Sequence, residues 1–286
     1  MSSLAFIVWN VNPDFLDIGK LSIRWYGVLY AVAFYVGYKI MKNLYQAEKL
    51  NQKEVDRLTW HLALGIIIGS RLGFMILHSQ ENVVKQYWDN PLDILKIWEG
   101  GLSSYGAAVG ILIAMYIYTR KGKVRSFLWI MDRVILVVII GAVFIRMGNL
   151  INSEIYGVQT NLPWGFKFIK DSLNIGKPVS QVIPHHPTQI YESLLFLVLY
   201  IVMFRLFKNK RKHFAPGTIL GIALIGLFSI RFCIEFIKEP QVSFNYAPLT
   251  RYGINMSHIL SFPFILFGII VLIYSTRLQK GKTVRL

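Results

Sequence analysis

The sequence has the composition of a membrane protein. Of its 286 residues, 54% are hydrophobic and 16% are charged, whereas about a quarter of the residues in soluble domains are charged. Mean hydropathy is +0.47. The net charge of +16 comes from basic residues in short clusters between long apolar runs, which is a membrane pattern and not a nucleic-acid-binding face. We therefore expect membrane lipids, and no nucleic acid, as partners.

Cysteine and histidine are too few for a disulfide framework or a cysteine-based metal site. The single cysteine, Cys233, lies in an apolar stretch without an adjacent histidine, so we expect a small hydrophobic side chain and not a nucleophile. The six histidines are scattered and show no metal-ligand spacing such as HExxH. We therefore expect no metal.

Seven stretches are apolar and long enough to cross a bilayer, which takes about 20 residues per helix. The predicted spans are Ile23–Met41, Thr59–His78, Gly101–Tyr118, Phe127–Leu150, Thr188–Phe207, Pro216–Ile237 and Ile254–Ser275. The first is a poor signal peptide, because Asp14 and Asp17 precede it and no small-residue cleavage site follows it. The sequence predicts an all-α polytopic membrane protein in which residues 1–286 form one integral membrane domain.

Lysine and arginine in the short loops indicate the orientation of the chain. With the N-terminus outside and the C-terminus inside, the inside segments carry sixteen of these residues and the outside segments eight. The longest outside connection, residues 151–187, is rich in glycine and proline and contains the alternating segment WGFKFI at 164–169. It predicts a small extracytoplasmic head with a short hairpin between spans four and five.

Eight arginine, aspartate and glutamate side chains fall inside the second to sixth predicted spans, where each costs at least about 2.5 kcal/mol at the bilayer centre. They are Arg71, Asp132, Arg133, Arg146, Glu192, Arg205, Arg231 and Glu235. Arg205, Asp132 and Arg133 lie near an inside end, where long side chains can snorkel to the interface.

The direction of each span places a second group of polar side chains at one depth, beneath the outer interface. Its members are Tyr26, Tyr105, Arg146, Glu192, Arg231 and Glu235. Arginines there suit a phosphate-bearing ligand, because guanidinium binds phosphate through forked, charge-assisted hydrogen bonds. Arg231 and Glu235 are also spaced to pair with each other on one helix face, an alternative that is compatible with a functional role for Arg231.

The segment from Arg146 to Gly157, RMGNLINSEIYG, runs off the end of the fourth span. It resembles the G-R-x-G-N-x-x-N-x-E-x-x-G signature of the prolipoprotein diacylglyceryl transferase family, with Ile145 in place of the leading glycine. Further resemblances follow in the family's order at Ile23–Gly27, Ser70–Gly73, Trp98–Ser103, His186–Glu192, Arg231–Phe236 and Leu260–Pro263. Together these motifs cover nearly the whole chain.

The resemblance implies a reaction on a bacterial cytoplasmic (inner) membrane, with the active site toward the outer leaflet. The sn-1,2-diacylglyceryl group of phosphatidylglycerol passes to the lipobox cysteine thiol in the signal peptide of a preprolipoprotein. A thioether forms and glycerol phosphate leaves, without a cofactor. The buried residues fit this chemistry, because such a site needs fixed positive charge on the leaving phosphate and help in deprotonating a thiol of pKa about 8.5.

The resemblance also implies residue roles. Arg146 binds the phosphate, and Arg231 stabilises the departing phosphate, oriented by Glu235. The predicted head-group or helix-end residues are Asn149, Asn152 and Glu154, and the glycines that allow close backbone approach are Gly148 and Gly157. The second-tier candidates for lining the pocket, which also fit as interfacial or helix-entry residues, are Tyr26, His186, Gln189, Tyr191 and Glu192.

Tyr105 is a departure from the family pattern and a candidate catalytic residue. Many members carry a histidine, assigned as the general base, at the corresponding position of the run Gly100–Gly106. A neutral phenol of pKa about 10 is a poor base near pH 7. Either a nearby arginine makes the tyrosinate accessible, or Tyr105 only hydrogen-bonds the lipid and another group such as His186 removes the proton.

A transporter of an anionic substrate is the alternative function, because buried charges also mark transport pathways. A transporter predicts polar features near the midplane and an inverted repeat between the two halves of the chain. Seven spans divide poorly into two inverted halves, and the polar groups collect on one side. The pattern therefore favours the transferase.

Overall fold

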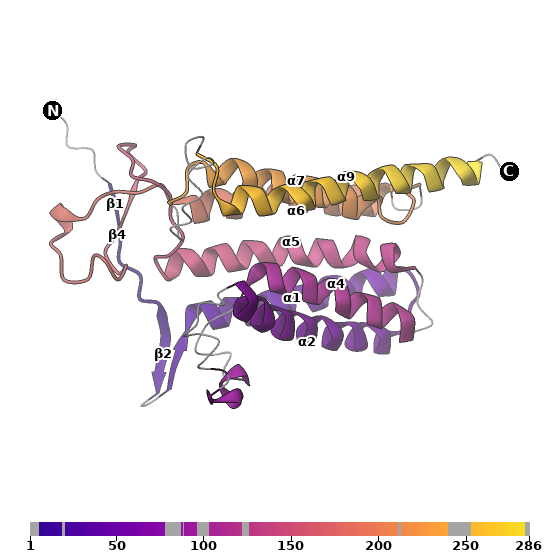
Figure 1. Ribbon diagram of the computed structural model, residues 1–286, viewed down its shortest axis with the longest axis horizontal. Coiled ribbons are helices and arrows are strands. Elements are labelled where there is room, and N and C mark those ends of the chain that lie inside the picture. The colour runs from indigo at the N-terminus through magenta and orange to yellow at the C-terminus, as the bar shows by residue number, and fades with distance from the viewer. Residues whose placement is uncertain are drawn as a thin grey trace. The chain divides into compact units, whose positions relative to one another are not determined.

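The computed structural model describes residues 6–18, 21–77, 87, 89–95, 103–121, 126–210, 213–239 and 253–283. This part of the chain is mostly helical (Figure 1). Its seven α-helices are α1 (Trp25–Ala47), α2 (Gln52–Leu77), α4 (Ser104–Lys121), α5 (Phe127–Ile151), α6 (Thr188–Lys210), α7 (Thr218–Glu235) and α9 (Met256–Thr283). The chain divides into two compact units, residues 41–131 and residues 1–40 with 132–286.

Five of these helices are long and apolar enough to cross a membrane: α2, α5, α6, α7 and α9. The predicted class of multi-pass helical membrane protein is confirmed at this level. Helices α1 and α4 coincide with the first and third predicted spans, and the count of seven spans stays a prediction. The span ends His78 and Gly101 and most of the motif Trp98–Ser103 lie outside the described residues.

Helix α2 begins well before Thr59, where the apolar run starts. Asn51 explains the earlier start, because its side-chain oxygen accepts a hydrogen bond from the Lys53 backbone N–H at 3.0 Å. A side-chain acceptor at this position satisfies a backbone donor of the first turn. Hydropathy locates the part of a helix that lies in lipid, and the cap shows where the helix itself begins.

In the unit of residues 41–131, α2 and α4 pack backbone against backbone. A Cβ atom on Gly69 would lie 2.5 Å from the carbonyl oxygen of Gly106, and small residues in both helices permit this approach, as is common in membranes. Arg71 on α2 donates hydrogen bonds to the carbonyls of Asp93 at 2.6 Å and Ile94 at 3.1 Å. Its buried charge therefore binds the 3-10 helix η1 (Pro91–Leu95).

In the other unit, Asp132 on α5 caps the N-terminus of α7. Its two carboxylate oxygens accept the backbone N–H groups of Gly217 and Leu220, each at 2.8 Å. The expectation that Asp132 snorkels to the interface is wrong, because the side chain is buried and serves donors that have no partner within their own helix. Helix α6 is joined to α5 by the Ser193 hydroxyl, which donates to the Val143 carbonyl at 3.0 Å.

The segment of residues 151–187, predicted as a head, contributes one strand to a small sheet. Strand β4 (Phe166–Phe168) pairs in parallel with β1 (Ile7–Trp9) from the N-terminal segment, while β2 (Asp14–Ile18) and β3 (Leu21–Arg24) form an antiparallel pair. The short hairpin predicted in residues 151–187 is present only as isolated antiparallel bridges of His185 with Gln159 and Phe166, and the strand partner of β4 comes from far away in the sequence. A head core of Leu150, Phe166 and Phe168, with Trp9, Tyr156 and Ile190 packed against it, ties the head to the end of α5.

Candidate functional site

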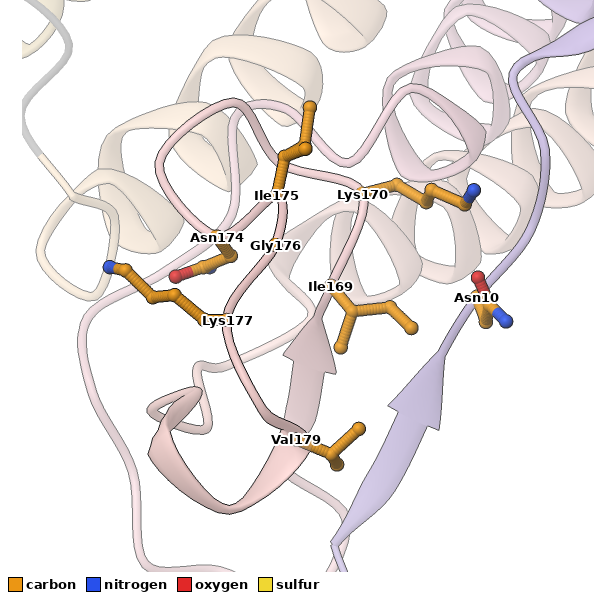
Figure 2. Close-up of a pocket in the computed structure, with 8 residues that line it drawn as sticks. All are labelled: Asn10, Ile169, Lys170, Asn174, Ile175, Gly176, Lys177 and Val179. Atoms are coloured by element: carbon orange, nitrogen blue, oxygen red, sulfur yellow. The ribbon is translucent and has the colours of Figure 1, made fainter.

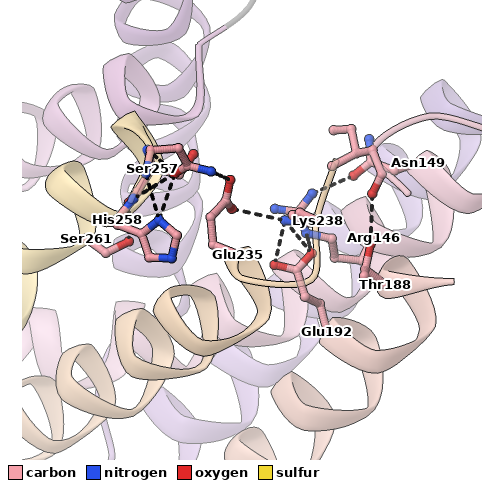
Figure 3. A network of polar contacts seen from close by, with 11 residues as sticks. Arg146, Asn149, Thr188, Glu192, Glu235, Lys238, Ser257, His258 and Ser261 are labelled. Carbon is pink, nitrogen blue, oxygen red and sulfur yellow. Dashed lines mark hydrogen bonds and ion pairs between the residues drawn. The ribbon is translucent and has the colours of Figure 1, made fainter. Parts of the chain in front are cut away.

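Arg146 and Glu192 form a buried ion pair between α5 and α6 (Figure 3). Arg146 Nε lies 2.8 Å from Glu192 Oε2, and the Glu192 side chain is 0% exposed. Arg146 also donates a hydrogen bond from Nη1 to Asn149 Oδ1 at 3.0 Å. Two of the three guanidinium nitrogens thus have fixed partners, and Nη2 takes part in no hydrogen bond with the described residues.

Lys238, one of the eight basic residues counted in the predicted outside segments, completes this ion pair. Its Nζ donates to Glu192 Oε1 at 3.0 Å and lies 3.0 Å from Oε2. It also lies 3.8 Å from Glu235 Oε2. Burial, followed by the charge of Arg146, lowers the pKa of the Lys238 ammonium below its ordinary value of 10.5, while the two carboxylates oppose this shift.

Glu235 connects the network to the start of α9. Its Oε1 accepts a hydrogen bond from Asn255 Nδ2 at 2.9 Å. Asn255 caps α9, since its side-chain oxygen accepts the backbone N–H of Ser257 at 3.0 Å and that of His258 at 3.2 Å. In return the Asn255 backbone N–H donates to His258 Nδ1 at 3.1 Å, which makes a reciprocal capping box. Sequence analysis missed Asn255, although asparagine before a helix is a cap signal.

Arg231 lies one turn before Glu235 on α7 and is half-buried. Its charge acts on Arg146, and the two guanidinium groups repel each other. The structure thus brings both predicted arginines to one cluster. The pairing of Arg231 with Glu235 stays a prediction.

The chain that leaves α5 is organised around Glu154. Its Oε1 accepts hydrogen bonds from the side-chain amides of Asn149 at 2.8 Å and Asn152 at 3.2 Å. Ser153 and Ile155 on either side have φ values of 57° and 62°, a left-handed conformation that is strained for a β-branched residue. The signature therefore forms a tight, strained turn beside Arg146.

Residues at the start of α6 hold this turn in place. Gln189 Nε2 donates to the Glu154 carbonyl at 2.7 Å, and the Thr188 hydroxyl donates to the Ile155 carbonyl at 3.1 Å. Gly157 has to be glycine, because a Cβ atom there would lie 2.5 Å from the Ile237 carbonyl oxygen. Gly157 thus packs closely against the chain after α7, and a contact of this glycine with the substrate stays a prediction.

Tyr26, at the start of α1, packs on the predicted glycine of α5. A Cβ atom on Gly148 would lie 2.7 Å from Tyr26 Cδ2, so the glycine makes room for the ring. The Tyr26 side chain is also close enough to Arg146 and Glu154 to feel both charges. It therefore lies beside the Arg146 cluster.

His186 and Tyr191 contact each other and the head. His186 Nδ1 lies 3.3 Å from the Tyr191 hydroxyl, which accepts a hydrogen bond from Trp164 Nε1 at 2.9 Å. Burial, followed by the neighbouring His185, lowers the pKa of His186 below 6.5. His186 is therefore neutral at pH 7 and able to accept a proton.

Tyr105 lies in the first turn of α4 and belongs to the unit of residues 41–131. Its side chain is half-buried. A role for Tyr105 in proton transfer stays a prediction.

Several buried polar atoms near Arg146 accept no hydrogen bond within the described part of the chain. They are Asn152 Oδ1, Ser153 Oγ and Gln189 Oε1. Buried polar groups in native proteins nearly always have partners, so atoms left over in one place indicate a site for a polar ligand. A pocket of about 270 Å³ in the head (Figure 2), with Lys170 and Lys177 in its wall, shares no residue with this network.

The fold and the site define a class: a polytopic helical membrane protein with arginines and carboxylates clustered where α5 and α7 end and α6 begins. The family model of prolipoprotein diacylglyceryl transferase matches residues 13–274, and the chain belongs to this family. Similar proteins named phosphatidylglycerol–prolipoprotein diacylglyceryl transferase include those of three bacteria. The Porphyromonas gingivalis protein is 37% identical (97% of each chain covered), that of Chloroherpeton thalassium 34% (99% of this chain, 100% of the relative) and that of Tolumonas auensis 32% (96% and 100%).

Proposed function

We propose that this protein transfers the diacylglyceryl group of phosphatidylglycerol to the lipobox cysteine of a preprolipoprotein signal peptide. The observation that carries the proposal is the held guanidinium of Arg146, with Nε on Glu192 and Nη1 on Asn149. Arg146 Nη2 is then able to donate a hydrogen bond to a phosphate oxygen. Membership of the family supports the same substrates, and it gives no support to the alternative reading as a transporter of an anionic substrate.

The proposed setting is the inner membrane of a bacterium, with seven spans and the N-terminus outside. The excess of basic residues in the inside loops supports this orientation. It places the ends of α5 and α7 at the outer interface, and the head between α5 and α6 outside the membrane. Arg146 then lies about 8 Å of helical rise from the end of α5, within reach of an outer-leaflet phosphate group.

The proposed chemistry is displacement at a glycerol carbon. The peptide thiolate forms a carbon–sulfur bond, the bond from that carbon to the phosphate oxygen breaks, and glycerol phosphate leaves with the bonding electron pair. Arg146 binds the phosphate in the ground state, and Arg231 stabilises the charge that grows on it. Fixed positive charge at a developing anion is typically worth a factor of about 10² to 10³ in rate.

The glycerol head group has candidate partners in the turn after α5. Hydroxyl groups donate hydrogen bonds, and the atoms without partners at Asn152 and Gln189 are acceptors. Glu154 already accepts from two asparagines and orders the turn that presents them. We assign the head group to this turn.

The thiol proton has two candidate acceptors, Tyr105 and His186. The lowered pKa of His186 leaves a neutral imidazole at pH 7 but makes it a weaker proton acceptor, and its Nδ1 faces the Tyr191 hydroxyl. Tyr105 occupies the position of the family's histidine. Both remain candidates for the general base.

The test follows glycerol phosphate release by purified protein in mixed micelles of detergent and phosphatidylglycerol. A lipobox peptide with cysteine is the acceptor, and the same peptide with serine is the negative control. We expect release only with the cysteine peptide and a loss of at least about a hundredfold in Arg146→Ala. The matched control is Arg205→Ala, an exposed arginine of α6, which should keep wild-type activity. No release by folded wild-type protein would overturn the proposal.

A further inference from the structure

Lys238 is a buried lysine to which the reaction assigns no role. Its Nζ lies 3.0 Å from Oε1 and from Oε2 of Glu192, and only 6% of the residue is exposed. Removing an ion of this size from water costs several kcal/mol even after the protein relaxes. Its burial beside the phosphate-binding arginine therefore requires an explanation.

The backbone fixes the position of Lys238. Lys238 bridges to Gly157 in an isolated β-bridge, and the Val158 N–H donates to the Ile237 carbonyl at 2.9 Å. The chain after α7 is thereby tied to the turn that follows Arg146. The lysine reaches Glu192 from an anchored segment and not from a loose loop.

Arg146 and Lys238 both contact the carboxylate of Glu192 (Figure 3). Arg146 approaches Glu192 most closely at Oε2, while Oε1 accepts a hydrogen bond from Lys238. An arginine and a carboxylate without other partners favour a two-point fork with two parallel hydrogen bonds. With Oε1 bound to the ammonium, that fork is not formed, and Arg146 Nη2 has no hydrogen bond to the described residues.

We propose that Lys238 is a positioning residue that holds Glu192 away from a two-point fork with Arg146, so that the guanidinium remains available to a phosphate. The inference rests on the proposed function, since it takes the phosphate of a phospholipid as the ligand of Arg146. Lys238 also neutralises part of the charge of Glu192, against which the phosphate competes. Without the lysine, Glu192 closes on Arg146 and phosphate binding weakens.

The experiment separates KM for phosphatidylglycerol from kcat in the release assay. In Lys238→Met we expect KM to rise on the order of tenfold with a smaller change in kcat, the pattern of a lost ground-state interaction. In Lys238→Arg we expect KM close to wild type, because the positive charge is kept. Adding Glu192→Gln to Lys238→Met removes the competing charge and should return KM toward wild type. Lys208→Met, an exposed lysine of α6, is the matched control.

A melting curve in detergent reports the folding of each variant independently of KM. A folded Lys238→Met with wild-type KM, or with a loss in kcat alone, overturns the positioning role while the transferase stands. No release by wild type overturns the proposed function itself. If Lys238→Met does not fold, the double variant decides, because it also removes the charge of Glu192 that Lys238 neutralises: a KM near wild type supports the proposal, and a tenfold higher KM contradicts it.

Discussion

The two ends of α7 both meet buried charge, but the hydrogen bonding differs. At the N-terminus, each oxygen of Asp132 accepts a backbone N–H at 2.8 Å. Beyond the C-terminus, Glu192 lies between two cations, with Oε2 2.8 Å from Arg146 Nε and 3.0 Å from Lys238 Nζ, while Asn152 Oδ1 and Gln189 Oε1 accept no hydrogen bond from the described residues. A buried charge whose atoms all have partners stabilises the fold. A buried ion cluster beside polar atoms without partners is typical of a site that binds a ligand.

We expect the largest effect on stability at Glu192, beyond the C-terminus of α7. Glu192→Ala leaves Arg146 and Lys238 buried without their shared counter-charge, and breaking a buried pair in this way costs about 3–5 kcal/mol. Thermal unfolding in detergent, followed by circular dichroism, measures the loss. The exposed Glu239 provides the control variant Glu239→Ala, which should melt close to wild type. An unchanged melting temperature in Glu192→Ala would show that the two cations find other partners.

At the N-terminus of α7, which Asp132 caps, we expect a loss of stability without a large loss of activity. Asp132→Ala removes the acceptor of two N–H groups and should cost about 1–3 kcal/mol of stability. Release per folded molecule, assayed well below the melting temperature, should stay within about twofold of wild type, because the first turn of α7 is far along the helix from Arg231. Asp132→Asn retains one good acceptor oxygen, so its stability should lie between that of wild type and that of Asp132→Ala. A large loss of activity without a change in melting would contradict this separation.

Tyr105→Phe tests whether the phenol transfers a proton. General-base catalysis contributes about 10² to 10⁴ in rate, so a phenol that only hydrogen-bonds the lipid predicts a loss of less than about tenfold on removal of its hydroxyl. We expect this smaller loss, because a phenol donates a hydrogen bond more readily than it accepts a proton. The measurement is kcat for release, with Tyr105→His as the companion variant. A loss beyond a hundredfold in Tyr105→Phe, restored in Tyr105→His, would identify Tyr105 as the base.

The sequence predicts the depth of the site residues in the membrane, but not the direction in which each side chain points around its helix. Each residue adds 1.5 Å along a helix, so residue number and span direction predicted that Arg146 and Glu192 lie at one level, and the structure joins them at 2.8 Å. The rotation of α6 was not predictable in the same way. Gln189 holds the turn after α5, whereas Tyr191, two residues later, faces Trp164 in the head.

The residues that sequence analysis missed lie outside the spans. A lysine in a loop is expected to be hydrated, and nothing in the sequence marks Lys238 as different. The chain folds back, however, and buries it. The pairing of β1 with β4 was beyond prediction for a related reason. Alternation of apolar residues marks a strand, but it does not identify a partner that lies elsewhere in the chain.

The smallest expected effect is a change in pH dependence at Lys238. Burial and the charge of Arg146 lower the pKa of this ammonium below 10.5, so it loses its proton at a lower pH than an exposed lysine. Below the lowered pKa, the ammonium holds Glu192. Above it, Glu192 closes on Arg146, and KM for phosphatidylglycerol should therefore rise with pH. In Lys238→Arg, whose side chain stays protonated in proteins, the rise should move to higher pH. Identical curves of KM against pH in the two proteins would show that the lysine proton does not control phosphate binding.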